Sequence, residues 1–354
     1  GDVVFVIRYF RPDVIITRFP EDGRAGHGHH SASGILAREG FIAAADPNRF
    51  PEQFKFGLKP WQAKRVLWNT FNFGGNNTIR ANQYKVDVGG YNTLLGKSYG
   101  EISAHSRSQH KSQGFGVPSQ RGESYEYFSN VAGDTVFTDL MDGVDITWNR
   151  AGDAVVEQKI NALLKNFNFA EPEKTVIGLL DLRDHFRINP NESPWAAHKY
   201  SEINKLIAAC TGLYFEATTS QPFAVTGDSL RISFSVINRS HVPVQRVNIF
   251  CIDTNVVIND TLKYNIPKTV TITRKVQASF LQDQPYWLRE QMSEGNFKIT
   301  VQHLLMNPRN DPNSITVSYF FRDKFPVSQK YPLQYKHTDP VKGELYEPVI
   351  TVPA

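Results

Sequence analysis

The chain has 354 residues, of which 12% are aromatic, and a formal net charge of +4. Its 39 basic residues are scattered among 35 acidic ones rather than clustered, which argues against a nucleic-acid-binding surface. No apolar stretch approaches the roughly 20 residues needed to cross a bilayer, and the length favours two domains.

The chain begins with features of an α/β unit. Residues Val3 to Phe10 are apolar and fit either a strand or a helix, and Arg11-Pro12-Asp13 ends the run. Val14 to Thr17 is a short continuous apolar run, typical of a strand buried on both faces of a parallel sheet. In such units, functional groups gather at the carboxyl end of the strand.

A helix is expected after a polar, glycine-containing loop from Pro20 to Gly28. The helix spans Ser31 to Ala45 and ends at Asp46-Pro47. The periodicity of its apolar residues predicts that one side is buried, namely Ile35, Leu36, Phe41 and Ile42.

Shorter elements are expected further along the first half of the chain. Arg65 to Phe71 and Lys85 to Val88 are expected to be strands, and Ser98 to Gln113 a polar helix. Gly114 to Gly122 is expected to be a loop, and the segment from Glu123 to Tyr127 to be exposed and partly packed.

The periodicity changes twice in the second half. From Val155 to Cys210 it is helical and indicates three helices, the third capped by Ser193. Beyond Gly212 apolar residues recur at every second position, which is typical of strands in an antiparallel sandwich. The expected strands are Leu230–Val236, Val247–Cys251, Thr269–Thr273, Phe297–Val301 and Ile315–Phe320. The extended tail from Asp339 to Ala354 is expected to be either a closing edge strand or a linker. The two cysteines, Cys210 and Cys251, fit neither a disulfide framework nor a thiolate metal site.

A histidine cluster, Gly26-His27-Gly28-His29-His30, lies directly ahead of the first predicted helix. His27 and His30 are three residues apart, so both side chains can point the same way from a first helical turn. Neutral imidazole is a good zinc ligand, and a second imidazole nearby can donate a proton to developing charge. The alternative is a glycine-rich surface loop that happens to contain histidines.

Three elements in chain order resemble the PIG-L (LmbE-like) family of zinc N-deacetylases. This family has an Arg-Pro-Asp strand, a Gly-His-Pro-Asp-His element that opens a helix, and a late helix ending in His-x-x-Ser-Gln. The matching segments are Arg11 to Thr17, Gly26 to His30, and Lys97 to Gln109 with its ending His105-Ser106-Arg107-Ser108-Gln109. The resemblance covers roughly residues 3 to 130.

The resemblance implies a Rossmann-like sheet and removal of acetyl groups from N-acetylglucosamine-type sugars or related amides. By motif matching, it implies that His30 is a ligand of a zinc cofactor. It also implies that His27 stabilises the tetrahedral oxyanion and protonates the leaving amine. Asp22 and Arg24 in the preceding loop, together with His105, are the candidates for substrate contact.

The sequence departs from the family in two places. The first family motif, Ala-His-Pro-Asp-Asp-Glu, which provides two further zinc ligands and an aspartate base, does not occur in it. Gly28-His29 also replaces the usual Pro-Asp. Because a catalytic zinc ordinarily has three protein ligands, we expect the chain to be the remainder of a longer enzyme. Lacking its N-terminal segment, which is an expected partner, it would be inactive alone.

The sequence therefore predicts three regions. They are a Rossmann-like α/β domain over residues 1–135, incomplete at its N-terminus, a helical spacer over 136–211, and an immunoglobulin-like β-sandwich over 212–354. The alternative function is that of a non-catalytic carbohydrate-binding or structural protein. By analogy with catalytic domains that carry appended sandwiches, we expect a secreted or periplasmic bacterial protein.

Overall fold

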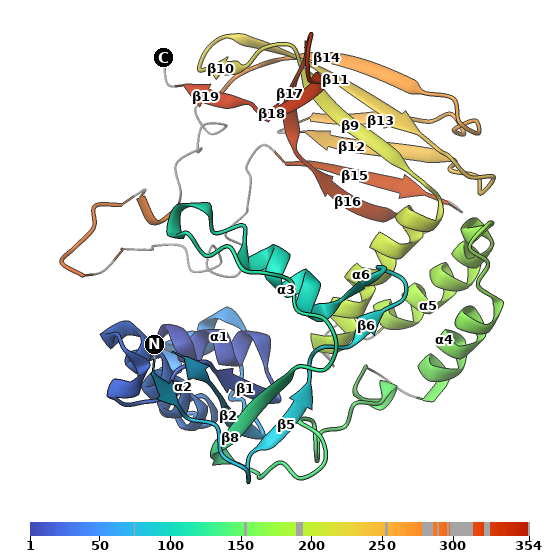
Figure 1. Ribbon diagram of the computed structural model, residues 1–354. Helices are drawn as coiled ribbons and strands as arrows, with labels where there is room; N and C mark the ends of the chain where they lie inside the picture. Colours follow the sequence, from blue (N-terminus) through green and yellow to red (C-terminus); the bar gives the residue numbers. More distant parts are fainter. Residues whose placement is uncertain are drawn as a thin grey trace. The chain divides into compact units, whose positions relative to one another are not determined.

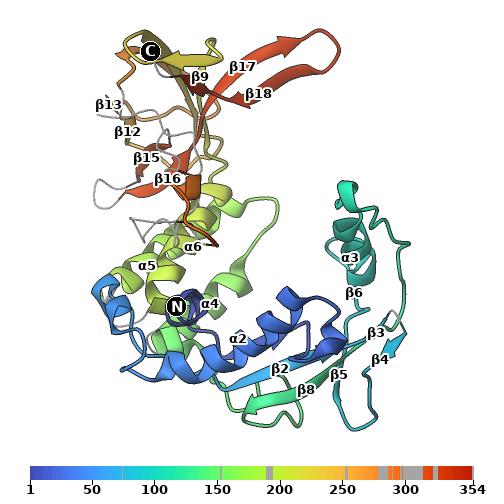
Figure 2. The same cartoon turned by 90° about the vertical axis from the view of Figure 1, so that its left-hand side faces the viewer.

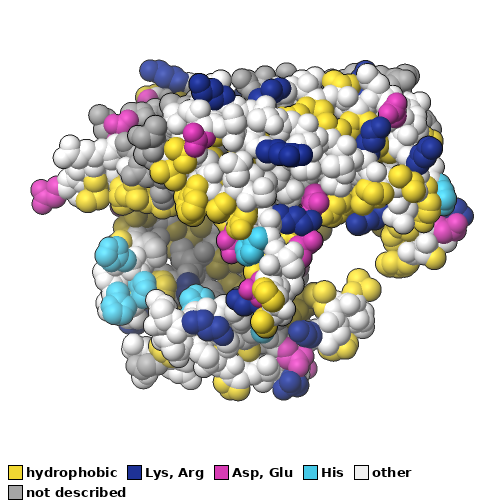
Figure 3. Space-filling model, turned by 90° about the horizontal axis from the view of Figure 1, so that it is seen from above, with side chains coloured by type: hydrophobic (Ala, Val, Ile, Leu, Met, Phe, Trp, Pro, Cys, Tyr) yellow, Lys and Arg dark blue, Asp and Glu magenta, His cyan; other side chains and the backbone are white. Residues whose placement is uncertain are grey.

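The computed structural model describes residues 1–73, 75–151, 154–188, 194–251, 254–277, 286–288, 290–295, 297, 314–321 and 326–352. It divides into two compact units, Gly1–Ile146 and Thr147–Ala354, and both contain helices and sheets (Figure 1). Within these ranges, no helix combines the length and apolarity that a membrane span requires. On the face drawn in Figure 3, basic and acidic side chains are interspersed.

The first unit is built on a four-stranded sheet with the order β1-β2-β8-β5. The pair β1 (Val14–Thr17) and β2 (Arg65–Thr70) is parallel, whereas β8 (Tyr125–Gly133) is antiparallel to both β2 and β5 (Tyr84–Asp87). The segment from Glu123 to Tyr127 is exposed and partly packed, as expected, and most of it belongs to β8, which the sequence does not predict. The sheet is therefore mixed. Two short strands, β3 (Asn72–Phe73) and β4 (Asn76–Asn77), pair beside it.

Strand β1 is less buried than its apolar sequence predicts. It lies at the end of the strand order, and the side chain of Ile16 is 51% exposed. The neighbouring Ile15 instead packs against a small core with α1 (Asp2–Phe10), so the ambiguous first run is a helix. Successive side chains of a strand point to opposite faces, so the face that carries Ile15 and Thr17 is covered while Ile16 points to an open face.

Helix α2 (Gly28–Ala45) begins three residues earlier than predicted and buries small residues rather than the predicted large ones. Leu36 and Ile42 are exposed, which corrects the predicted apolar side. At Gly40 a Cβ would lie 2.9 Å from Cγ1 of Val3, so α1 approaches too closely for a large side chain. The buried residues of α2 are Gly34, Gly40, Ala43 and Ala44.

A fully buried arginine, Arg8, holds the carboxyl end of α2 and the loop after it. Its Nε donates to the carbonyl of Ala44 at 3.1 Å. Its two terminal nitrogens donate to oxygens of Ala43, Asp46, Arg49, Phe50 and Gln53. The short 3-10 helix η2 (Pro51–Phe56) follows this loop.

An arm made of residues 90–121 extends from one end of β5 and β8 (Figure 2). It contains the hairpin of β6 (Tyr91–Asn92) and β7 (Lys97–Ser98), helix α3 (Tyr99–Arg107) and the 3-10 turn η3 (Lys111–Gln113). Helix α3 is shorter than the predicted Ser98–Gln113, and Ser98 and Glu101 form a capping box at its start. Where the arm joins the sheet, the Asp87 carboxylate accepts from the N–H groups of Gly89 (2.8 Å) and Ser124 (3.0 Å).

The second unit begins with η4 (Trp148–Ala151) and the three predicted helical stretches. These are α4 (Ala154–Asn166), α5 (Val176–Ile188) with η5 (Pro172–Thr175) before it, and α6 (Pro194–Cys210). Buried side chains of these helices, such as Val156 and Ile207, belong to the same core cluster as those of the sheets. The helices expected as a spacer over 136–211 therefore share a core with the β part. The predicted cap Ser193 lies outside the described residues.

Two larger sheets and one pair of short strands complete the second unit. The five-stranded sheet has the order β14-β11-β9-β17-β18, and the four-stranded sheet the order β13-β12-β15-β16. The predicted alternation is confirmed in β11, where Leu230, Ile232 and Phe234 are buried. Tyr319 is fully buried and Phe320 nearly so, so both are core residues. The strands are β9 (Tyr214–Thr219), β11 (Ser229–Ile237), β12 (Arg246–Cys251), β13 (Thr254–Ile258), β14 (Lys268–Lys275), β15 (Ile315–Phe320), β16 (Val327–Tyr331), β17 (Leu333–Asp339) and β18 (Gly343–Pro348).

The remaining parts of this unit are short. Strand β10 (Phe223–Val225) pairs in parallel with β19 (Ile350–Val352). Of the two possibilities for the extended tail, a closing edge strand or a linker, the edge strand is confirmed, because β18 ends the order of the five-stranded sheet. A 3-10 turn, η7, spans Tyr286–Leu288. Neither Cys210 nor Cys251 forms a disulfide, as the sequence predicts; Cys251 is buried and Cys210 partly so. Most of the expected strand Phe297–Val301 lies outside the described residues.

Candidate functional site

The histidine cluster opens helix α2, after the 3-10 turn η1 (Gly23–Ala25). Gly26 has a φ of +82°, a conformation that favours glycine, and it turns the chain into the extended cap residue His27. The His27 carbonyl accepts from the N–H groups of His30 (3.0 Å) and Ser31 (3.2 Å). His30 therefore lies in the first turn of the helix.

The rings of His27 and His30 lie together. Their centroids are 5.0 Å apart with an edge-to-face angle of 86°. The half-buried His30 ring also stacks flat on Phe19, at 3.7 Å and 5°, which fixes its plane. His27 is exposed. The pair therefore consists of one oriented imidazole and one that is accessible to solvent.

A backbone hydrogen bond defines which nitrogen of His30 is available. Nδ1 lies 3.0 Å from the carbonyl oxygen of Ala25. A carbonyl only accepts, so the bond assigns the proton of the neutral ring to Nδ1 and leaves the lone pair on Nε2. This is the arrangement by which proteins orient a metal-binding histidine.

Asp22 and Arg24 bind each other rather than the histidines. The Asp22 carboxylate accepts from Nε of Arg24 at 2.9 Å and from its Nη2 at 2.6 Å. These bonds lower the pKa of Asp22 to about 2. The Arg24 guanidinium also lies 5.2 Å from the centre of the Trp68 ring. All three side chains line a cavity of about 310 Å³ near the end of β1, together with Thr17, Phe19, Pro20, Glu21, Gly34, Arg38 and Val131.

A polar group that the sequence does not reveal forms next to the carboxyl ends of β1 and β2. The Asn69 side chain donates to Glu126 at 2.7 Å, and Arg18 bonds to Asn69 and lies 3.4 Å from the same carboxylate. Glu126 comes from β8, which the sequence does not predict. Because the three residues are widely separated along the chain, only the strand pairing brings them together.

His105 lies apart from the histidine pair. It is exposed on α3, and its backbone carbonyl accepts from Nε2 of Gln109 at 3.2 Å. Figure 2 shows α3 in the arm, away from α2. The structure therefore does not bring the predicted His105 to His27 and His30.

The fit of a metal to this site is partial. His30 has the oriented, unprotonated nitrogen that a zinc ligand needs. Among the residues that the structure describes, however, no three His, Cys, Asp or Glu side chains are grouped as metal ligands. The described residues thus provide a ligand but not a zinc-binding set.

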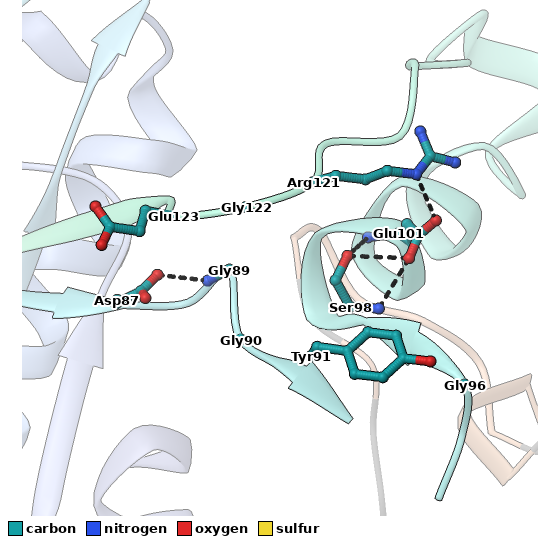
Figure 4. A pocket seen from close by; sticks show the side chains of 10 residues that line it. All are labelled: Asp87, Gly89, Gly90, Tyr91, Gly96, Ser98, Glu101, Arg121, Gly122 and Glu123. Atoms are coloured by element: carbon teal, nitrogen blue, oxygen red, sulfur yellow. Dashed lines mark hydrogen bonds and ion pairs between the residues drawn. The ribbon is translucent and has the colours of Figure 1, made fainter. Parts of the chain in front are cut away.

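A larger cavity, of about 520 Å³, lies where the arm meets β5 and β8 (Figure 4). Four of its ten lining residues are glycines, and four of the other six are charged. The lining residues are Asp87, Gly89, Gly90, Tyr91, Gly96, Ser98, Glu101, Arg121, Gly122 and Glu123. The sequence does not predict this cavity. Its walls come from two segments about thirty residues apart, and these meet only because the two ends of the arm lie side by side.

Comparisons with known proteins add little. No family model and no curated protein sequence matches the chain. Among solved structures, the CARDB domain of a Pyrococcus furiosus protein in complex with di-metal ions is 9% identical. That match covers 40% of this chain and 89% of that one, with a TM-score of 0.19.

Two further structures match at similar levels. The Pseudomonas fluorescens alkylpurine DNA glycosylase AlkC is 8% identical, over 44% of this chain and 47% of that one, with a TM-score of 0.17. A beta-glucosidase from Listeria innocua is 9% identical, over 34% of this chain and 16% of that one, with a TM-score of 0.16. At such TM-scores the similarities carry no argument about function.

Proposed function

We propose that the first unit carries the histidine part of a zinc-dependent N-deacetylase that acts on N-acetylated sugars or related amides. The observation that supports this best is the bond from His30 Nδ1 to the Ala25 carbonyl, which leaves Nε2 free beside a second imidazole. The PIG-L-like segments from Arg11 to Gln109 agree with this chemistry. The same proposal includes a Rossmann-like arrangement for the sheet of the deacetylase domain.

Each residue has a role in this proposal. His30 would hold the zinc ion, which when bound polarises an acetamide carbonyl and lowers the pKa of a bound water. His27 is exposed and lies next to His30, so it can donate a proton to the departing amine and a hydrogen bond to the oxyanion. Asp22 and Arg24, fixed to each other at the wall of the nearby cavity, present a planar charged pair to sugar hydroxyls.

The proposal requires zinc ligands beyond those in the described residues, since a catalytic zinc ordinarily has three from the protein. The test therefore compares the 354-residue chain with the product of its complete gene. Zinc affinity is measured by competition with a chelator, and turnover is measured on N-acetylglucosaminyl substrates. We expect weak zinc binding and no turnover from the chain alone if its gene encodes further ligands.

Single substitutions in the complete gene product separate the roles. His30→Ala should lower zinc affinity at least about tenfold, because it removes a ligand. His27→Ala should retain zinc and lower kcat by about 10²–10⁴, the usual contribution of a positioned acid. His29→Ala is the matched control, since His29 is an exposed imidazole in the same turn.

Two results would contradict the proposal. If His30→Ala leaves zinc affinity unchanged, the site is not a zinc site, and the chain is better explained as a non-catalytic carbohydrate-binding or structural protein. If the 354-residue chain turns over substrate with zinc, the need for further ligands is refuted.

A further inference from the structure

One edge of the five-stranded sheet in the second unit is a long, regular strand. Among the residues that the structure describes, β14 pairs only with β11 and ends the strand order (Figure 1). Eight consecutive residue pairs join the two strands without a shift of register, so no bulge twists the edge away. The strand also contains neither proline nor glycine. A further strand can therefore be added to it through backbone hydrogen bonds.

The outward backbone groups of this edge belong to three threonines. Just beyond β14, the N–H and carbonyl groups of Val276 bond to the backbone directly ahead of β11, at 2.8 and 2.9 Å. The backbone groups of successive residues in an antiparallel strand point to opposite sides. Those of Thr269, Thr271 and Thr273 therefore point away from β11, and all three residues are exposed. They offer the alternating donors and acceptors that an added strand needs.

An added strand would also cover apolar surface. Val270 and Ile272 alternate with the threonines and pack against the core, but both are only partly buried. Val256 of β13, the end strand of the four-stranded sheet, is likewise only partly buried. Side chains of an added strand that point to the same face would contact Val270 and Ile272. Alternating β-branched residues suit this face best.

The charge of the edge restricts the occupant further. Strand β14 has no acidic residue and three basic ones, Lys268, Arg274 and Lys275. Asp260 balances Lys268 through a 2.9 Å ion pair, whereas Arg274 donates to a neutral threonine hydroxyl and Lys275 is exposed. The adjacent end of β11 adds one charge of each sign, from Arg231 and the preceding Asp228. The end of β14 at Arg274 and Lys275 is therefore positively charged and attracts carboxylates.

A second copy of the chain fits this edge less well than a separate peptide. Antiparallel pairing of two β14 strands would set the basic residues of one copy against those of the other. The acidic strand β18 is also a poor occupant, because its Glu344 is already bound by Lys336 at 3.1 Å and its Pro348 has no N–H group. A peptide that brings its own carboxylates meets neither obstacle.

We propose that β14 binds an extended acidic peptide of another protein as an added strand. Its β-branched residues face Val270 and Ile272, and a carboxylate lies beside Lys275. The interaction needs neither zinc nor the histidine pair, so it is independent of the proposed deacetylase function.

The probe is the peptide Glu-Thr-Val-Thr-Val-Thr-Glu, amidated and carrying an N-terminal fluorescent label, titrated with the full chain and followed by fluorescence anisotropy. Glutamate at both ends places one carboxylate near Lys275 in either strand direction. We expect saturable binding that weakens as the salt concentration rises. Two matched peptides should each bind at least about tenfold less tightly. One has lysine in place of both glutamates, and the other keeps the glutamates but carries N-methyl groups on its central amides, which removes their hydrogen bonds.

Variants of the chain localise the binding. Thr271→Pro removes an outward N–H at an edge, where proline is tolerated, and should weaken binding at least about tenfold. Thr271→Val keeps the N–H and should bind as the parent chain does. Lys275→Glu should weaken binding of the glutamate peptide and strengthen that of the lysine peptide. Lys330→Glu is the matched control, since Lys330 is an exposed lysine of β16, at the end of the other large sheet.

Four results would overturn the proposal. No binding of the glutamate peptide shows that the edge accepts no such strand, and equal binding of the N-methylated peptide shows charge attraction alone. Equal binding of the lysine peptide refutes the selection by charge. A dimer of the chain in sedimentation, lost in Thr271→Pro, assigns the edge to a second copy. The peptide comparisons need only the parent chain, so they stand even where a variant fails to fold.

Discussion

The guanidinium of Arg8 replaces the usual cap of a helix end. The last carbonyl groups of any helix have no hydrogen-bond donors within that helix. At the end of α2 these donors come from Arg8, which belongs to α1. Burial lowers the pKa of Arg8, while Glu52 and Asp46 oppose that shift. A planar group with five donors suits such a cluster of carbonyls better than an ammonium does.

We therefore predict that Arg8→Met destabilises the first unit by at least about 3 kcal/mol, because it leaves several buried carbonyls without partners. Arg8→Lys should lose nearly as much, since it keeps the charge but not the planar donors. The midpoint of urea unfolding measures both. Arg49→Met is the control, because Arg49 is exposed, and it should change the free energy of unfolding by less than about 0.5 kcal/mol. A small effect of Arg8→Met would show that water replaces the guanidinium.

At the scale of elements, the close packing of α2 against the loop that precedes it depends on one glycine, Gly34. A Cβ at Gly34 would lie 2.9 Å from the carbonyl oxygen of Phe19 and 3.2 Å from the backbone of Pro20. Neither atom is the end of a flexible side chain, so the loop itself would have to move. Since the Phe19 ring stacks on His30, the packing of α2 and the orientation of the imidazole depend on the same contact.

We predict that Gly34→Ala costs about 1–3 kcal/mol through overpacking and shifts the ring resonances of His30. Gly28→Ala is the matched control in the same helix, where a Cβ would meet nothing within 4 Å. It should be neutral or stabilising by up to about 1 kcal/mol, because alanine favours the helix. Chemical denaturation and NMR of the His30 ring measure both effects. Equal behaviour of the two variants would refute the role of the close contact.

Sequence patterns predicted correctly those features that depend only on residues close together in the chain. The spacing of His27 and His30 and the helix after them follow from a few consecutive residues, and the alternation in β11 reflects burial on one face. The sequence could not show that Leu36 would be exposed, because that depends on which element packs against α2, and the small residues that α2 buries carry no strong periodic signal.

At the scale of the whole molecule, the two units differ in their cores. The first has a small cluster of Val4, Ile7, Ala43 and Ala44 besides the buried residues of its sheet. The second has a far larger cluster that combines its helices with both of its larger sheets. Stability rises with the apolar surface buried, so the first unit should be the less stable of the two.

Hydrogen exchange in increasing denaturant tests this difference. Amides of β2 and β8 in the first unit should lose protection at a lower denaturant concentration than those of β11 and β12 in the second. The reason is the smaller core of the first unit. A single shared transition for all four strands would instead show that the chain unfolds as one cooperative body.

The carboxylate of Asp87 binds backbone N–H groups on both strands that lead into the arm, beside the close crossing of Gly89 and Gly122. The Asp87 side chain, together with the 2.6 Å bond from the Val88 N–H to the Ser124 carbonyl, therefore helps to fix the angle at which the arm leaves the sheet. A substitution that alters these contacts would change that angle and move Tyr91 and Arg121, and the displacement grows with distance from the base. Residues outside the cavity can in this way alter its width without lining it.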